Sequence, residues 1–349
     1  MVDVIAIGGI NVDYIVRKTS ANARLLDDVV LESERQVDAQ RIEKLLDRVG
    51  RSNVRRVLGG SAFNAAQAIA AAAAQMTVGY VGVAGVIPGE TFDVLAEMKA
   101  SRISVDLIRR SRAISGQCVA VVDGTRRGLE TCPGANLELA EHLDERRATI
   151  LSTLGAARLV HITSFFDRPA VERVLSLLDG AKMANTALRI SFDPGHFMCR
   201  DDCDLVLGFA GMSDYLFLSD RELALLARAR QPAEEAVRSL LAQIGGQRLT
   251  IIVKESGRVS VFGAARGDVS VARFSHEALA ADQIHSPTGA GDVCAAGFLV
   301  GFLTPGFDLE RAALLSSRMV RAKLTSPEPN SRKLGLSRIL TGLAGDPTS

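Results

Sequence analysis

The sequence predicts an α/β protein built around one mainly parallel sheet. Short β-rich runs alternate with helical segments through almost all of its 349 residues. Each run is continuously apolar, which is typical of strands that are covered by helices on both faces. The length fits one large α/β domain or two ordinary ones, and 47% hydrophobic with 23% charged residues is the composition of a globular protein.

Charge and composition exclude several kinds of partner. The net charge of +1 gives no reason to expect a nucleic acid. No run is long and apolar enough to predict a membrane span, and the first residues lack the basic start and cleavage site of a signal peptide. Five scattered cysteines, an odd number, favour reduced thiols. We therefore expect a cytoplasmic protein that binds a small molecule, without a nucleic acid or membrane partner.

The strands of the large sheet are predicted from six apolar runs bounded by turn residues. They are VDVIAIGG (2–9), TVGYVGVAG (77–85), ARLVHITSF (157–165), ALRISFDPG (187–195), SDYLFLS (213–219) and RLTIIVKESG (248–257). Helical periodicity before or after each run supplies the covering helices.

Two regions interrupt this alternation, at about 14–58 and 112–135. The first contains one amphipathic helix, DAQRIEKLLDRVG, with Asp38 as a predicted N-cap and Gly50 as a C-cap. The second contains an Asp-Gly pair between two strand-like runs, which is a strong hairpin signal. We expect the two regions to meet as a small β-rich lid over one edge of the main sheet.

The chain is therefore divided into a main domain, residues 1–325 including the lid, and a C-terminal extension, residues 326–349. The extension is expected to end in a short peripheral helix. An exposed β-rich lid could also pair across a homodimer.

A glycine-rich stretch carries the first chemical signal: HSPTGAGDVCAAGF, which contains Gly289, Ala290, Gly291 and Asp292. Glycines let successive N–H groups face one point, and the start of the following helix adds unsatisfied N–H groups and a positive dipole end. Such a site suits a phosphate. The acid then makes sense as the group that takes a proton from a hydroxyl during phosphoryl transfer. The alternative is a simple helix cap after a glycine turn.

This stretch resembles the C-terminal motif of the ribokinase family of carbohydrate and nucleoside kinases, Asp-Thr-x-Gly-Ala-Gly-Asp before a small-residue helix. Ser286 and Pro287 stand where Asp-Thr is commonest. A second stretch, GGSAFNAAQAIA (59–70), resembles the family's N-terminal motif, Gly-Gly-x-x-x-Asn-x-Ala. Neither the P-loop nor the dinucleotide-binding motif occurs. The likeness covers residues 3–325 and implies a ribokinase-like three-layer sandwich that uses ATP and Mg²⁺.

The resemblance also implies roles for individual residues. Asp292 is the expected base, and the N–H groups of Gly289, Ala290 and Gly291 stabilise the moving phosphoryl group. The expected acceptor-binding residues are Asn11, Asp13, Gly59, Gly60, Asn64 and Asn136. The expected nucleotide-binding residues are Ser219, Glu222, Lys254, Gly257 and Asp193, with Glu222 also reaching the metal through water.

The layout is most similar to that of adenosine kinases, so the resemblance implies phosphorylation of the hydroxymethyl group of a nucleoside. Phe63, Phe165 and Phe166 could stack on a base, or they could simply pack in the core. Arg126 and Arg127 could close over phosphate, or they could be a solvated turn. A kinase for a free sugar or phosphosugar, such as fructose or ribose, stays open, and a basic pocket would favour a phosphosugar. A non-catalytic nucleoside-binding relative is the third alternative.

Overall fold

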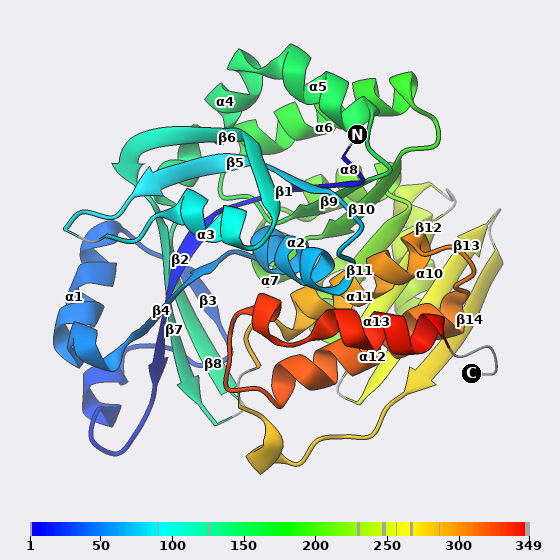
Figure 1. Cartoon of the computed structure of the whole chain (residues 1–349). Coiled ribbons are helices and arrows are strands. Elements are labelled where there is room, and N and C mark those ends of the chain that lie inside the picture. The colour runs from blue at the N-terminus through cyan, green and yellow to red at the C-terminus, as the bar shows by residue number, and fades with distance from the viewer. Residues whose placement is uncertain are drawn as a thin grey trace.

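The protein forms a three-layer sandwich with a second, smaller sheet at one side (Figure 1). The structure is a computed structural model that describes residues 2–89, 91–124, 126–228, 231–245, 249–255, 257–265, 268–285 and 287–345. In this described part, the large sheet has nine strands in the order β14-β13-β12-β11-β10-β9-β1-β5-β6. All neighbours are parallel except the first two pairs in this order, β14–β13 and β13–β12, which are antiparallel.

The six apolar runs are confirmed as strands of this sheet: β1 (Val4–Ile7), β5 (Val78–Val86), β9 (Leu159–Thr163), β10 (Arg189–Asp193), β11 (Tyr215–Ser219) and β12 (Leu249–Glu255). The sheet also contains β6 (Ile103–Ile114), β13 (Arg258–Ala265) and β14 (Asp268–Ser275). Strand β1 shows why the runs are continuously apolar. Val4 and Ala6 contribute to one buried core, whereas Ile5 and Ile7 contribute to the other.

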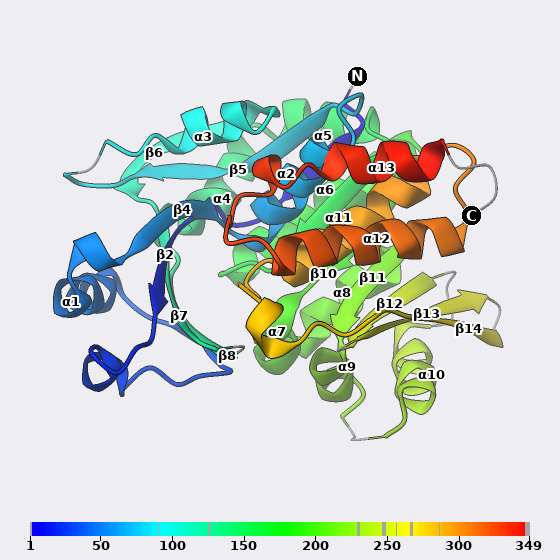
Figure 2. The same cartoon turned by 60° about the horizontal axis from the view of Figure 1, so that its bottom comes forward.

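Helices cover both faces of the large sheet, as the sequence predicts (Figures 1 and 2). One layer contains α2 (Ser61–Ala72), α3 (Val94–Ala100), α11 (Ala290–Leu303), α12 (Leu309–Leu324) and α13 (Leu336–Ala344). The opposite layer contains α4 (Leu139–Glu145), α5 (Arg147–Gly155), α6 (Arg168–Ala184), α7 (Gly195–Asp201), α8 (Cys203–Met212), α9 (Asp220–Leu226) and α10 (Ala233–Ile244), with the 3-10 turn η3 (Gly134–Glu138) before α4.

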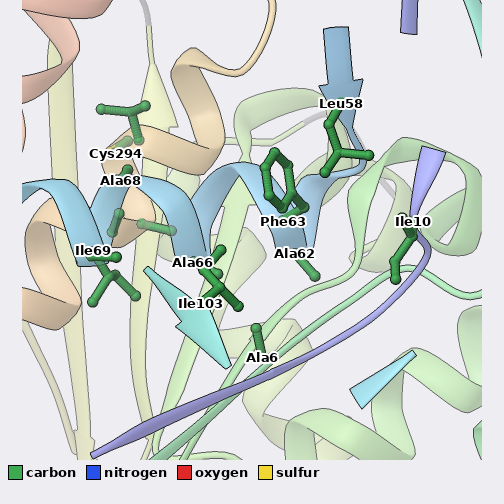
Figure 3. Packing of buried hydrophobic residues seen from close by; sticks show 14 of the residues in the cluster. Ala6, Ile10, Leu58, Ala62, Phe63, Ala66, Ala68, Ile69, Ile103 and Cys294 are labelled. Carbon is green, nitrogen blue, oxygen red and sulfur yellow. The ribbon is translucent and has the colours of Figure 1, made fainter. Parts of the chain in front are cut away.

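The alanine-rich helix α2 lies in the middle of its layer (Figure 3). Its small side chains, including Ala62 and Ala66, pack toward β1, while Ala68 lies beside Cys294 of α11. The fit is close, because a Cβ added to Gly8 would lie 2.7 Å from the Cβ of Ala62. This packing fixes the two motif-bearing helices, α2 and α11, side by side.

The second sheet joins segments that are far apart in the sequence, because strands from both irregular regions pair in it. In the described residues it has five strands in the order β3-β8-β7-β2-β4. They are β2 (Asn11–Arg17), β3 (Glu34–Gln36), β4 (Arg55–Gly59), β7 (Gly116–Asp123) and β8 (Arg126–Cys132), with the short 3-10 turns η1 (Ala23–Leu26) and η2 (Arg51–Asn53) between them. Residues 112–114 belong to β6 instead, because Ile114 still pairs with Val86 of the large sheet.

Helix α1 (Ala39–Val49) packs on the second sheet and matches its prediction closely. The side chain of Asp38 accepts a hydrogen bond from the N–H of Arg41 at 2.7 Å, which caps the helix. Gly50 ends the helix with a positive φ of 76°. The buried face is Ile42, Leu45, Leu46 and Val49.

The C-terminal residues return to the core of the main domain. After η4 (Ala281–Gln283), α11 and α12, the chain passes through the turn η5 (Ser331–Lys333) into α13. Leu336, Leu340 and Leu343 of α13 are buried in the same core as α2. The N–H of Ser331 also donates to Oε1 of Gln67 on α2 at 2.8 Å. Of the helices in the described residues, none has the length and apolar character to cross a membrane.

Candidate active site

The predicted phosphate loop leads directly into helix α11. Gly289 is its N-cap with a φ of 80°, a left-handed conformation that L side chains rarely adopt. Asp292 lies in the first turn, where N–H groups lack partners within the helix. One predicted donor is already engaged, because the N–H of Ala290 donates to the carbonyl of Pro287 at 3.3 Å. Ser286 lies outside the described residues.

Asp292 is hydrogen-bonded to Asn64, which belongs to the second motif, Gly-Gly-x-x-x-Asn-x-Ala. Nδ2 of Asn64, on α2, donates to Oδ2 of Asp292 at 2.9 Å. Burial raises the pKa of Asp292, whereas the hydrogen bond from Asn64 and the positive charges of Lys254 and Arg127 oppose the rise. A buried carboxylate with a raised pKa is the kind of group that can accept a proton near neutral pH.

Asp13 on β2 faces the same space from the second sheet. Burial raises its pKa to about 7, and the nearby negative charge of Asp292 adds to the rise. Gly59 leaves room for this carboxylate, because a Cβ there would lie 2.0 Å from Oδ2 of Asp13. Gly60 has a φ of 100° and packs on the backbone of Gly9, where a Cβ would meet the carbonyl oxygen at 2.3 Å. The glycine pair therefore shapes the wall that holds Asp13.

Asn136 lies behind this wall, which differs from the predicted direct contact with the acceptor. Its Oδ1 accepts from the N–H of Ile10 at 2.8 Å, and its Nδ2 donates to the carbonyl of Pro133 at 2.9 Å and to Oδ1 of Asn11 at 3.0 Å. These bonds use the donor and acceptor groups of the Asn136 amide within the protein. Asn136 thus fixes the orientation of Asn11, which does line the cavity.

A second charged group gathers where β10, β11 and β12 end. Nζ of Lys254 lies 2.6 Å from Oδ2 of Asp193. Burial raises the pKa of Asp193 to about 7 against the effect of Lys254, and the charge of Glu222 contributes to the rise. Ser219 and Glu222 form a capping box on α9, in which Oε2 of Glu222 accepts from the N–H of Ser219 at 2.7 Å. One oxygen of Glu222 is therefore used locally.

Most of the predicted residues line one of two adjoining cavities. A cavity of about 210 Å³ is lined by Asn11, Asp13, Gly60, Asn64, Asp193, Glu222, Lys254, Gly289, Gly291 and Asp292. A neighbouring cavity of about 870 Å³ runs between α12 and the ends of β12 and β14, and Gly257 and Ala290 lie in its wall. Lys254 and Gly291 line both cavities, so the two meet beside the start of α11. Gly59 and Ser219 are not among the residues that line either cavity.

The donor set fits a phosphate-bound magnesium ion better than a resident metal. Among the described residues, no group of three or more His, Cys, Asp or Glu side chains could hold a metal ion. Mg²⁺ usually keeps several waters and binds through one or two carboxylates together with substrate phosphates. The free oxygen of Glu222 suits such a water. In the described chain, Oγ1 of Thr288 is buried without a hydrogen-bond partner beside the same cavity, so its hydroxyl is available to a phosphate there.

The structure separates residues that the sequence leaves ambiguous. Phe63 is fully buried, and Phe165 stacks on another core ring at 5.9 Å, so only Phe166 reaches the small cavity. Arg126 pairs with a surface acid, whereas Arg127 lines the cavity.

Lys323 on α12 is a residue that the sequence reasoning missed. It is only 3% exposed, and its Cε lies 3.6 Å from the position of a Cβ on Gly289. The signal was present, because Lys323 follows Ala312, Ser316 and Met319 at helical spacing along the buried stripe of α12. A lysine in such a stripe indicates a special environment.

Together, the sandwich, the second sheet and an acid at a helix start beside two cavities define an enzyme of the ribokinase-like class. The profile of the pfkB family of carbohydrate kinases matches residues 34–332, and the chain belongs to this family. It is therefore a phosphotransferase that acts on a hydroxyl group, as the carbohydrate kinases of this family do.

One relative by sequence and two solved structures are similar to this chain. The ATP-dependent ribose-1-phosphate kinase of Halopiger xanaduensis is 29% identical over 281 residues, which are 78% of this chain and 83% of that protein. Adenosine kinase from Schistosoma mansoni, in complex with 2-fluoroadenosine, has a TM-score of 0.79 at 16% identity, covering 93% of this chain and 95% of that one. Adenosine kinase from Sinorhizobium meliloti also has a TM-score of 0.79, at 21% identity, covering 98% and 99%. These two structures confirm the predicted fold.

Proposed function

We propose that the enzyme phosphorylates the hydroxymethyl group of a ribose ring that carries an anionic substituent, as in ribose 1-phosphate. The observation that carries this proposal is Arg127. Its guanidinium lines the acceptor cavity and, within the described residues, has no hydrogen-bond or ion-pair partner. Its charge acts on the pKa of Asp13 and of Asp292. An unpaired guanidinium in a cavity wall is a natural receptor for a phosphate.

The proposed reaction needs positioning more than covalent chemistry. Asp13 accepts hydrogen bonds from two ring hydroxyls, and Asn64 holds Asp292 toward the acceptor. The acceptor oxygen forms a bond to the γ-phosphorus as its proton passes to Asp292, and the bond from that phosphorus to the β-bridging oxygen breaks to release ADP. N–H groups at the start of α11, with Lys254, stabilise the charge on the moving group. Glu222 would contact a water of a phosphate-bound Mg²⁺, which would neutralise phosphate charge.

The relatives support a ribosyl acceptor. The protein from Halopiger xanaduensis is named for ribose 1-phosphate. The base-stacking surface expected for a nucleoside is limited to Phe166, because the other two phenylalanines pack in the core. The second sheet, which supplies Asp13 and Arg127, would act as the lid predicted at about 14–58 and 112–135.

An acceptor panel with ADP release as the readout tests the proposal. Ribose 1-phosphate should be the best acceptor, and ribose 5-phosphate should fail because its hydroxymethyl oxygen is already esterified. Arg127→Met should raise the KM for ribose 1-phosphate on the order of 10- to 100-fold, the range of a hydrogen bond to a charged group, and should raise the KM for free ribose by much less, through the effect of the lost charge on Asp13 alone. Arg126→Met is the matched control. Equal use of ribose and ribose 1-phosphate would exclude the phosphate-binding role.

A nucleoside remains the second candidate, for a specific reason. Cys118, Ala120 and Leu129 of the second sheet form a small apolar wall in the cavity that also contains Phe166. A base could lie between them. Turnover of adenosine with a lower KM than ribose 1-phosphate would favour this candidate.

Two further expectations belong to the proposal. The cysteines in the described residues are all free thiols, which suits the cytoplasm as its location. The outer strands of the second sheet, β3 and β4, offer edges through which two copies could pair. Sedimentation analysis of the free enzyme would measure that association.

A further inference from the structure

Lys323 is a buried ammonium group with an unusual set of neighbours. Its Nζ donates to the carbonyl of Pro329 at 2.7 Å. Within the described residues, no carboxylate lies within ion-pair distance of it. Burying a charged group costs free energy unless it is paired with an opposite charge and fully hydrogen-bonded. A hydrophobic residue would therefore be expected at position 323, on the buried face of α12. Lys323 packs against Gly289, the N-cap of α11, because a Cβ on Gly289 would lie 3.6 Å from Cε of Lys323.

The carbonyl that Lys323 binds belongs to a Pro-Glu-Pro segment, residues 327–329, which we call the strap. Two residues earlier in the strap, the carbonyl of Pro327 accepts from Nη1 of Arg55 at 2.8 Å. Nη2 of Arg55 also lies 2.7 Å from Oε1 of Glu328. Arg55 begins β4 of the second sheet. The strap is thus bound at one end by the second sheet and at the other by Lys323.

The phosphate loop is tied to the same region. The N–H of His285 donates to the carbonyl of Leu324, the residue that follows Lys323, at 2.8 Å. The carbonyl of His285 accepts from Nη2 of Arg17, on β2, at 3.1 Å. Two contacts from the second sheet, through Arg55 on β4 and Arg17 on β2, therefore meet the segments around Lys323 and the start of α11.

We propose that Lys323 is a positioning residue for phosphoryl transfer, which holds the strap against the phosphate loop and so joins the placement of the second sheet to that of Asp292. This inference rests on the proposed role of Asp292. Lys323 does not contact the reacting atoms in this arrangement. It fixes the backbone around Gly289, and its positive charge favours the ionised form of Asp292.

The titration of Lys323 supports this role. Burial lowers its pKa to about 8, against the opposing effect of Asp292. The other charged groups that face it are Arg55 on β4, which lowers the pKa, and Glu328 on the strap and Asp13 on β2, which raise it. Because the pKa in the folded protein lies below that of a free lysine, the ammonium is present below about pH 8 and is lost as the pH rises through 8. Catalysis should weaken over the same interval.

Three variants test the proposal in the full-length enzyme. Lys323→Met should lower kcat on the order of 10- to 100-fold, the range of a lost hydrogen bond from a charged group. Lys323→Arg keeps the charge at all accessible pH values, so the fall in kcat expected above pH 8 for the wild type should not occur in this variant. Lys333→Met is the matched control, because Lys333 also binds the strap, 3.3 Å from Glu328, but is exposed to solvent.

Hydrogen exchange of the free protein supplies a readout that does not depend on any substrate. Lys323→Met should speed exchange of amides from Gly289 to Val293 and of β4, and Lys333→Met should leave the loop amides unchanged. If the wild type transfers phosphate to no member of the acceptor panel, the proposed function fails, and hydrogen exchange still decides on Lys323. Equal exchange in both variants, or an active wild type whose kcat stays constant from pH 7 to 9.5, would overturn the positioning role.

Discussion

Replacing Asp292 by asparagine is the most direct test of the reaction centre. The change keeps the shape of the side chain, and the amide oxygen can take the place of Oδ2 as the acceptor of the 2.9 Å bond from Asn64. The fold should therefore be unchanged. A positioned general base contributes roughly 10²- to 10⁴-fold to the rate, equivalent to about 2.7–5.5 kcal/mol. We expect kcat to fall by this factor, measured as ADP release at saturating acceptor.

The same variant has a second effect that a simple loss of fold would not produce. Asp13 must be ionised to accept two hydroxyls, and its pKa of about 7 is raised first by burial and then by the charge of Asp292. In the wild type, acceptor affinity should improve as the pH rises through about 7. Without the charge at position 292, the pKa of Asp13 falls, and the midpoint of the affinity curve should move to lower pH.

Calorimetric titration of the acceptor between pH 5.5 and 8.5 measures this midpoint in both proteins. Wild-type kcat in the Asp292→Asn variant would remove the acid from the mechanism. An unchanged midpoint would show that the two carboxylates do not influence each other, contrary to the geometry described above.

Three further changes have outcomes that follow from single contacts. Gly59→Ala places a Cβ where it would lie 2.0 Å from Oδ2 of Asp13, so the KM for the acceptor should rise at least tenfold while the KM for ATP stays constant in steady-state assays. Lys254→Met leaves Asp193 buried without its partner at 2.6 Å, and the free energy of unfolding should fall by about 3–5 kcal/mol at pH 8, with a smaller loss at pH 5.5 where the carboxyl is protonated. Ser219→Ala removes the cap of α9 and should cost about 1 kcal/mol in urea denaturation. Full stability of the Lys254 variant at pH 8 would contradict the buried pair.

Much of the large sheet could be predicted because its strands are buried on both sides. A run such as VDVIAIGG must be apolar at every position when Val4 and Ile5 enter different cores, and that signal is local. The same holds for the glycine-rich loop, since the left-handed conformation of Gly289 is a property of one residue and its neighbours. The pairing of β2 with β7 could be predicted from the expectation that two exposed β-rich regions share a sheet.

The rest of the candidate site depends on contacts that no local pattern encodes. Asn136 has the residue type of a sugar ligand, yet its amide is used up by Ile10, Asn11 and Pro133, and only tertiary structure shows this. The choice between Arg126 and Arg127 depends on strand alternation at a hairpin, which directs one into solvent and the other into the cavity. Lys323 could have been suspected from its helical register, but its neighbours come from four different segments.

The junction of the two cavities has a consequence for inhibition. Lys254 and Gly291 line both the small polar chamber and the larger, more apolar one, and Gly291 adds no side chain where the two adjoin. A compound that tethers a ribosyl group to a nucleoside through a phosphate chain could thus fill both chambers at once. Its second half would bind with the high effective concentration that a short tether supplies.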